Sequence, residues 1–258
     1  MPDYNTFVTK VNRLVDLDLS LYKEAQMKRR LTSLRNKRGY DTFASYFKAL
    51  QTDETLREEF VDRITINVSE FYRNPRRWDV LQDKVFPKLI EQNPRKRLHI
   101  WSAACSTGEE PYSLSIMLTE HFRHVDFTIT ATDIDDKALE AAREGVYGEQ
   151  ALKDLPPQKK STYFTFKNNK YYVKEELKKN IIFKKHNLLK EPYPQNIDLI
   201  VCRNVLIYFT DEAKEYIYTH LSKSLSSKGI LFVGSTEQIF NPNSYNLELF
   251  DTFFYEKI

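Results

Sequence analysis

The feature that most restricts the fold of this chain is an alternation of strand-like and helix-like patterns that begins near residue 97. Five apolar runs, rich in β-branched and aromatic residues, are typical of buried strands: RLHIWSAA, FTITATD, NIIFKKHN, DLIVCRN and ILFVGS. Apolar residues at helical spacing follow three of them, in segments 111–122, 135–145 and 211–225. This order predicts an α/β fold in which helices cover a mostly parallel sheet, with the run DTFFYEKI as its last strand.

The N-terminal part of the chain shows a different pattern, with apolar residues at helical spacing and no strand-like runs. Met27 and Leu34 belong to one such stripe, and Asp53 stands where it can cap a further helix. We therefore expect a helical domain over residues 1–75 and an α/β domain over residues 76–258.

A second, smaller sheet is expected between Asp154 and Asn180, where the sequence leaves the α/β alternation. Two aromatic runs, around Phe164 and Tyr172, flank the turn-forming sequence KNNK. They predict a β-hairpin that is inserted into the α/β domain as a subdomain over about residues 155–180.

The turn after the first predicted strand, CSTGEEPYS, lacks the residues that bind phosphate. A dinucleotide site needs three spaced glycines and a P-loop needs a lysine, but only Gly108 is present and no lysine follows. Glu109 and Glu110 occupy the position where an anion would bind, and their charges would repel a phosphate. The turn therefore favours a cationic nucleoside such as S-adenosylmethionine. A capping box is an equally good alternative, because Ser106 and Thr107 each precede a glutamate by three residues.

An acidic residue at the end of the next strand supports the ligand interpretation. Asp133 ends the run FTITATD, where nucleoside-binding α/β proteins place a carboxylate that accepts hydrogen bonds from the ribose hydroxyls. Asp135 and Asp136 follow it and can cap the next helix. We assign the ribose to Asp133 because it lies at the carboxyl end of the strand.

Charge and composition point to an acidic protein partner. The 258-residue chain has a formal net charge of +3, but residues 20–40 carry seven basic residues and one glutamate. That segment sums to +6 (7 − 1), so the rest of the chain sums to −3 (3 − 6), and we expect a local acidic partner. The first residues lack a signal peptide and no 18-residue apolar window occurs, so we expect a cytoplasmic protein. Cys105 and Cys202 are expected to be buried thiols, and no metal is expected.

Five motifs in order give the chain a more specific resemblance: ITINVSEFYR, WSAACSTGEEPYS, TDID, HNLLKEPY and CRNVLIYF. Together they resemble the CheR-type chemotaxis receptor glutamate O-methyltransferases, and the resemblance covers nearly the whole chain. It implies a Rossmann-like S-adenosylmethionine-dependent methyltransferase domain, with an antiparallel last strand, after a small helical domain that recognises the receptor. The implied reaction transfers a methyl group to receptor glutamate side chains and leaves methyl esters and S-adenosylhomocysteine.

The resemblance also implies a set of site residues. The implied cofactor contacts are Asn67, Ser69, Arg73, Glu110, Asp133, Asn187, Leu188, Asn204 and Val205. Glu110 would hold the methionine end of the cofactor and Asp133 its ribose. Arg73 would orient the substrate carboxylate and Tyr208 would lie near the transferred methyl group, so these two are the expected catalytic residues. Ser69 stands where the family has threonine and keeps the hydroxyl.

Several of these residues have a purely structural alternative. Asn187 and Leu188 would border the adenine, but the asparagine could cap a turn and the leucine could belong to the core. Tyr208 could be a core aromatic at a strand-to-helix junction, and Arg73 could pair with an acidic surface group.

The basic segment, taken as a helix over residues 20–38, suggests how a substrate would dock. Lys28 and Arg35 then flank one side of the buried stripe. Arg30 and Lys37 flank the other side. The resemblance implies that this helix docks on the acidic, helical cytoplasmic region of membrane chemoreceptors, whereas a solvated basic face is the alternative.

Other questions stay open from the sequence. No nucleic-acid contact and no membrane insertion are expected, and the oligomeric state is unreadable, with a monomer as the default. An RNA methyltransferase, supported only by the basic helix, and a non-catalytic cofactor-sensing module that binds receptors are the alternative functions. The sequence does not decide which receptor glutamates are modified, or whether the hairpin grips a receptor C-terminal peptide.

Overall fold

The computed structural model describes residues 2–15, 17–92 and 97–258, which fold into two compact units. The helical unit comprises Met1–Asn67 and Ile207–Tyr216, and the sheet unit comprises Val68–Leu206 and Ile217–Ile258. The segment Ile207–Tyr216 thus belongs to the helical unit although it lies far from that unit's other residues in the sequence.

Helices that follow the expected periodicity build the helical unit. They are α1 (Pro2–Val15), α2 (Glu24–Lys37), α3 (Phe43–Thr52) and α4 (Glu54–Thr65), with a 3-10 turn at Leu19–Leu21. Asp53 starts α4 as expected, because its carboxylate accepts a hydrogen bond from the Leu56 amide at 3.0 Å. The rings of Phe7, Tyr46 and Phe60 contact one another at the centre, and all three side chains are buried. These aromatic contacts hold the helices together.

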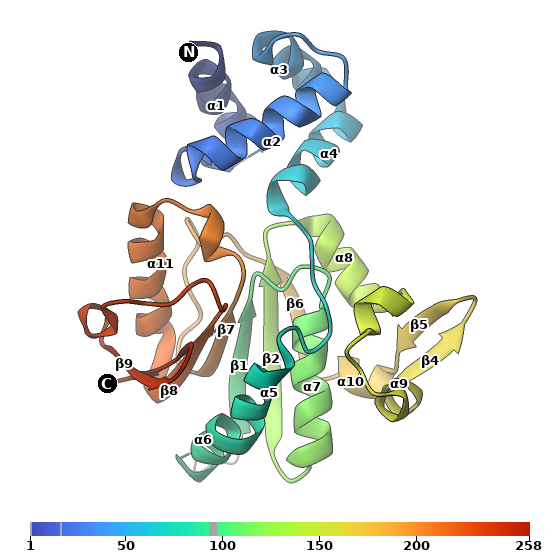
Figure 1. Ribbon diagram of the computed structural model, residues 1–258, viewed down its shortest axis with the longest axis vertical. Coiled ribbons are helices and arrows are strands. Elements are labelled where there is room, and N and C mark those ends of the chain that lie inside the picture. The colour runs from blue at the N-terminus through green and yellow to red at the C-terminus, as the bar shows by residue number, and fades with distance from the viewer. Residues whose placement is uncertain (1, 16, 93–96) are drawn as a thin grey trace. The chain divides into compact units, whose positions relative to one another are not determined.

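Within the described residues, seven strands form the main sheet of the sheet unit, in the order β6-β2-β1-β7-β8-β10-β9. Their bounds are β1 Arg97–Ala103, β2 Asp126–Asp133, β6 Ile181–Lys185, β7 Ile197–Cys202, β8 Leu225–Val233, β9 Leu247–Asp251 and β10 Phe254–Lys257. Strands β6, β2, β1, β7 and β8 pair in parallel, whereas β10 pairs antiparallel with both β8 and β9 (Figure 1). The prediction of a mostly parallel sheet with an antiparallel last strand is confirmed.

Helices of the sheet unit cover these strands and share one core with them. They are α5 (Pro75–Val80), which continues through a π-helical turn (Leu81–Val85) into α6 (Phe86–Gln92), then α7 (Glu109–His121), α8 (Asp136–Glu144), α9 (Pro157–Tyr163) and α10 (Glu175–Lys178). The helix α11 (Asp211–Ser224) contributes only its part from Ile217 onward to this unit. Leu114 and Ile116 of α7 pack in one core with Ile100 of β1 and Ile129 of β2, and each is at most 1% exposed. Each such side chain contributes about 1.5–3 kcal/mol by burial, so the strand ends are held in fixed register.

A small three-stranded sheet contains the expected hairpin. It has the order β3-β5-β4, with β3 at Val146–Tyr147, β4 at Phe164–Lys167 and β5 at Lys170–Val173. Asn168 and Asn169 form the hairpin loop at φ 52° and 57°, the left-handed conformation that two-residue hairpin loops favour. The hairpin projects from the sheet unit in Figure 1. The inserted hairpin is confirmed, and the short strand β3 is an addition to it.

The sequence patterns do not predict every strand. β9 is too short to show a clear alternation, and it becomes a strand by pairing with β10. β8 begins at Leu225, before the predicted run ILFVGS, because Leu225 pairs with Ile197 of β7 although SSKG reads as a turn.

Among the helices of the described residues, none is long and apolar enough to cross a membrane.

Candidate active site

The strand order singles out one edge of the main sheet. The chain crosses from β1 to β2 and β6 on one side and from β7 to β8 on the other, so the topology reverses between β1 and β7. In open α/β sheets, ligands bind outside the carboxyl ends of the strands at such a switch point. The segments at the carboxyl ends of β1, β2 and β7 carry Glu110, Asp133 and Arg203.

The turn between β1 and α7 takes an unusual backbone path. Ser106 lies at φ 49° and Gly108 at φ 95°, and a Cβ atom on Gly108 would stand 2.9 Å from the Cβ atom of Ala142. Glycine is therefore required at this position for both conformation and space. Gly108 itself is the N-cap of α7, without a side-chain cap. The capping-box alternative for Ser106 and Thr107 is wrong, since the Thr107 hydroxyl instead donates to Glu109 at 2.7 Å.

Glu109 is a buried carboxylate at the start of α7. Its side chain lies in the first turn of α7, and the residue is only 4% exposed. The hydroxyls of Thr107 and Ser69 donate to its carboxylate. Burial raises the pKa of Glu109, and these hydrogen bonds oppose that rise. Glu109 thus connects the segment that carries Ser69 to the start of α7.

Glu110 lies beside Glu109 but faces other partners. The Ser102 hydroxyl donates to its Oε1 at 2.8 Å, and its Oε2 is 3.5 Å from Nη1 of Arg203. The Glu110 side chain is 14% exposed. Burial raises the pKa of Glu110, and the positive charge of Arg203 opposes the rise. A carboxylate with this much exposure keeps access to a ligand while its position is fixed.

Asp133 ends β2 with its carboxylate held by backbone amides. Its Oδ2 accepts from the Ser106 amide at 2.7 Å and its Oδ1 from the Asp135 amide at 3.0 Å. Burial raises the pKa of Asp133, and these amides oppose the rise. Asp135 caps α8, because its side chain accepts from the amides of Lys137 and Ala138. The two aspartates therefore have separate tasks, and Asp133 also fixes the β1–α7 turn through Ser106.

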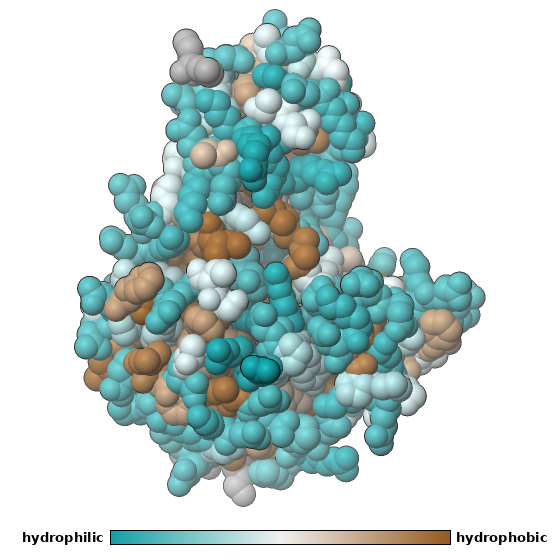
Figure 2. Space-filling view, viewed as in Figure 1, coloured by the Kyte–Doolittle hydropathy of each residue, from teal (hydrophilic) through white to brown (hydrophobic). Residues whose placement is uncertain are grey.

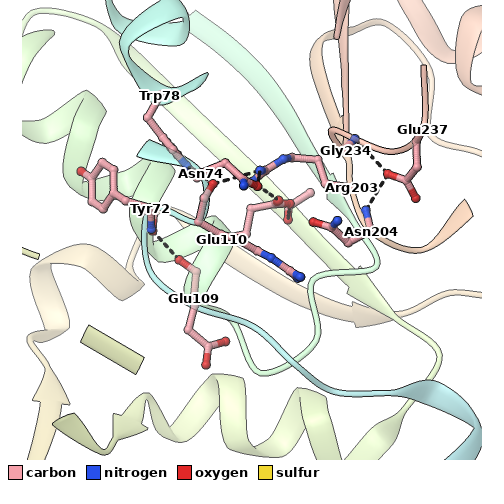
Figure 3. A network of polar contacts seen from close by, with 12 residues as sticks. Tyr72, Asn74, Trp78, Glu109, Glu110, Arg203, Asn204, Gly234 and Glu237 are labelled. Atoms are coloured by element: carbon pink, nitrogen blue, oxygen red, sulfur yellow. Dashed lines mark hydrogen bonds and ion pairs between the residues drawn. The ribbon is translucent and has the colours of Figure 1, made fainter. Parts of the chain in front are cut away.

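Arg203, directly after β7, connects several parts of the site. Its Nη2 donates to the Arg73 carbonyl oxygen and to Oδ1 of Asn74, both at 2.9 Å (Figure 3). Its Nη1 faces Glu110, and its guanidinium carbon lies 4.6 Å from the ring centroid of Phe232. Burial lowers the pKa of Arg203, and the charge of Glu110 opposes the change. The sequence reasoning missed this residue, although it stands inside the motif CRNVLIYF.

Glu237, after β8, was also missed. Its Oε2 accepts from the amides of Asn204 at 2.6 Å and Gly234 at 2.9 Å (Figure 3). Its Oε1 accepts from the Leu206 amide at 2.7 Å. Asn204 lies at φ 60°, so the chain turns sharply where these amides converge. A glutamate two residues after the predicted strand ILFVGS is the only signal for this role in the sequence. Glu237 holds the segment Asn204–Val205 at the end of β7.

The remaining predicted residues differ in what surrounds them. Oδ1 of Asn187 accepts from the Leu189 amide at 2.9 Å, so the asparagine does cap a turn. Leu188 is 7% exposed and packs as a core residue. Asn67 and Tyr208 belong to the helical unit, whereas the other predicted cofactor residues belong to the sheet unit.

The predicted docking residues lie on two sides of α2, as expected. The stripe of α2 that includes Met27, Leu31 and Leu34 is buried. Toward α1 and α3, Nζ of Lys28 is 5.2 Å from the Tyr4 ring centroid, and the guanidinium carbon of Arg35 is 4.6 Å from that of Phe43.

On the other side of α2, Arg30 is engaged within its own unit. Its Nη1 donates to the Ile64 carbonyl at 3.1 Å, and its guanidinium carbon is 5.6 Å from the Tyr208 ring centroid. Lys37 lines a hollow between α2 and α4 of about 500 Å³. The other residues that line it are Gln26, Arg29, Arg30, Ser33, Leu34 and Arg63. The hollow therefore has four cationic side chains and no carboxylate among its lining residues, and Figure 2 shows a mostly hydrophilic surface over these helices.

The residues at the sheet edge fit a cationic nucleoside better than a nucleotide. Among the described residues, Glu110 is contacted by the Ser102 hydroxyl and by the Arg203 guanidinium, and Asp133 accepts from the amides of Ser106, Asp135 and Ile134. A carboxylate has about four lone-pair sites, so both side chains retain acceptor capacity. Such groups can accept from an ammonium and from ribose hydroxyls, whereas they would repel a pyrophosphate. Among the described residues, no cluster of His, Cys, Asp and Glu is arranged to hold a metal ion. Cys105 and Cys202 are buried free thiols, as predicted.

Comparisons with known proteins agree with this arrangement. Residues 2–65 match the model described as CheR methyltransferase, all-alpha domain, and residues 67–253 match that of CheR methyltransferase, SAM binding domain. A chemotaxis protein methyltransferase of Listeria monocytogenes is 46% identical over 255 residues, which cover 99% of this chain and 97% of that protein. The chain is also 37% identical to a chemotaxis protein methyltransferase of Borreliella burgdorferi, over 86% of this chain and 83% of that protein. It is 33% identical to chemotaxis protein methyltransferase 1 of Pseudomonas aeruginosa, over 95% of this chain and 93% of that protein. The chain belongs to the CheR methyltransferase family.

Proposed function

We propose that this S-adenosylmethionine-dependent methyltransferase of chemotaxis modifies glutamate side chains of membrane chemoreceptors, producing methyl esters and S-adenosylhomocysteine. The observation that carries the proposal is the acidic β1–α7 turn, where a carboxylate replaces the phosphate-binding elements of a nucleotide site. The family membership and the chemotaxis relatives support the same reaction.

The proposal gives each residue of the site a task. Glu110 accepts from the ammonium of the methionine end, and Asp133 accepts from the ribose hydroxyls. Asn187 and Leu188 border the adenine. The turn in which Asn187 accepts from the Leu189 amide is compatible with this role. The other proposed cofactor contacts, taken from the motifs, are Asn67, Ser69, Arg73, Asn204 and Val205.

The proposed reaction requires little acid–base catalysis from the protein. Bound S-adenosylmethionine supplies an electrophilic methyl group on a sulfonium. A glutamate in water has a pKa of about 4.3, so the acceptor carboxylate is ionised at neutral pH and needs no general base. Opposite charges combine as the methyl group is transferred, so excluding water and orienting the carboxylate provide the acceleration. Arg73 orients that carboxylate and Tyr208 shapes the place of transfer; the role of Tyr208 rests on the motif alone.

Docking of the receptor is assigned to the basic side chains of α2, namely Lys28, Arg30, Arg35 and Lys37. An acidic, helical receptor region complements the hollow between α2 and α4, whose cations lack a carboxylate among the lining residues. Because Arg30 also bonds to Ile64, reversing its charge would disturb the helical unit. The sharper variant is Arg35→Glu/Lys37→Glu, with Lys223→Glu, at an exposed position of α11, as control. We expect the KM for the receptor to rise in the double variant and not in the control, and we expect this rise to be smaller at high salt.

One experiment tests the reaction itself. The protein is incubated with labelled S-adenosylmethionine and membranes that contain chemoreceptors, and the product is treated with base. Base-labile label on receptor glutamates is the expected result, and Arg73→Ala should lower turnover at saturating cofactor by a larger factor than it lowers cofactor affinity. Label that survives base, or label on RNA, would exclude glutamate ester formation. Cofactor binding without any transfer would favour the non-catalytic module, which nothing in the comparisons favours.

A further inference from the structure

Arg203 differs from the other basic side chains of the sheet unit in how completely it is enclosed. The residue is 7% exposed, and its guanidinium lies against the Phe232 ring. Its two Nη atoms point to different parts of the site, while its Nε has no hydrogen-bond partner within the described structure. A buried arginine that forgoes a donor is retained for what its remaining contacts achieve.

Those contacts connect two segments that the sequence keeps apart. Nη2 holds the Arg73 carbonyl and the Asn74 side chain, in a turn where Tyr72 and Asn74 lie at φ 52° and 62°. Nη1 faces the Glu110 carboxylate at 3.5 Å. We infer that Arg203 is a positioning residue, which sets the Arg73–Asn74 turn and the Glu110 carboxylate in the arrangement that binds the amino-acid end of the cofactor. The inference rests on the proposed roles of Glu110 and Arg73.

The positive charge of Arg203 also favours the ionised form of Glu110. Among the described ionisable groups that act on Glu110, Arg203 favours its charged form and Glu237 opposes it. Cys105 and Cys202 also face Glu110, but burial raises the pKa of both thiols, so they are neutral. Without Arg203, the largely buried Glu110 would hold its proton up to a higher pH and would be a weaker acceptor for an ammonium.

The test measures binding of S-adenosylhomocysteine to the full-length protein by calorimetry between pH 6 and 8.5. In Arg203→Met we expect a Kd at least tenfold above that of the unsubstituted protein at pH 7. The ratio of the two Kd values should fall as the pH rises, because Glu110 then ionises again. Using the ratio cancels the titration of the ligand's own amino group, because that titration is common to both proteins. Arg203→Lys, which keeps a charge but lacks the planar fork, should restore part of the affinity.

Two comparisons separate positioning from a general loss of structure. Arg143→Met removes a guanidinium whose hydrogen bond, within the described part of the chain, is to the Phe183 carbonyl, and it should leave the Kd unchanged. In a Glu110→Gln background, Arg203→Met should weaken binding by a smaller factor than in the unsubstituted protein. An equal factor in both backgrounds, or a Kd ratio that is constant with pH, would overturn the inference. If Glu110→Gln binds S-adenosylhomocysteine as well as the unsubstituted protein does, the result refutes the proposed role of Glu110 before that of Arg203.

Discussion

Replacing Glu237 by glutamine would test how firmly the end of β7 is held. The carboxylate accepts three backbone amides, from Asn204, Leu206 and Gly234, at 2.6–2.9 Å. Glutamine has the same size, but one of its two terminal atoms is an NH₂ group that only donates. In either orientation of the amide, at least one buried N–H therefore faces another donor.

The size of the effect follows from these three bonds. In the better orientation the Leu206 amide loses its acceptor, which costs about 2 kcal/mol for an unsatisfied buried donor. The other two bonds change from charge-assisted to neutral, and each loses about 1 kcal/mol. The neutral amide is easier to bury than the carboxylate, which offsets part of this sum. We expect Glu237→Gln to lower the free energy of unfolding of the sheet unit by roughly 3 kcal/mol.

Urea unfolding followed by tryptophan fluorescence measures this change. Both tryptophans, Trp78 and Trp101, are buried in the sheet unit, so their emission reports on that unit. Glu248→Gln, at an exposed position of β9, is the matched control and should change the free energy by less than about 0.5 kcal/mol. A loss below about 1 kcal/mol in Glu237→Gln would refute the view that charged acceptance holds this segment.

Three further outcomes can be measured. Gly234→Ala should destabilise the sheet unit in the same urea assay, because its Cβ atom would stand 2.3 Å from Oε2 of Glu237, whereas Gly148→Ala, with nothing within 4 Å, should be neutral. Asp53→Ala removes the cap of α4 and should cost the helical unit about 1 kcal/mol by circular dichroism, and an unchanged midpoint would contradict the cap. Binding of S-adenosylhomocysteine should weaken as the pH falls, because Glu110 becomes protonated, with a midpoint above the usual carboxylate range near 4; a midpoint at or below that range would argue against a buried acceptor.

The sequence predicts those parts of the fold that depend on local pattern. The alternation after residue 97 and the stripe of α2 follow from periods of 2 and 3.6 residues, and both are confirmed. β9 could not be predicted in the same way, because pairing with β10 makes it a strand. The capping-box alternative is wrong, because Gly108 and not Ser106 or Thr107 is the N-cap of α7. Which residue caps the helix depends on backbone angles that the motif does not encode.

The candidate site could be predicted in its outline but not in its support. Asp133 ends β2, and Glu110 lies in the first turn of α7, the helix that follows β1, so their positions in the sequence indicate their positions in the fold. Arg203 and Glu237 act through backbone groups of segments that are distant in the sequence. A backbone acceptor or donor leaves no mark on residue type, so only the folded arrangement shows these contacts.

The charges of the sheet edge explain why its shape and its ligand preference are linked. Glu109, Glu110, Asp133 and Glu237 bring four carboxylates to this edge, against the single buried guanidinium of Arg203. Asp133 and Glu237 accept backbone amides of the turns they hold, so their charges shape the chain and also make the local potential negative. Glu110 accepts no backbone amide in the contacts described, and its partners there are the Ser102 hydroxyl and the Arg203 guanidinium, so it retains capacity to accept from a ligand. The structural carboxylates Asp133 and Glu237 thus make the potential at this edge negative, which favours the cationic ligand that we propose Glu110 to contact.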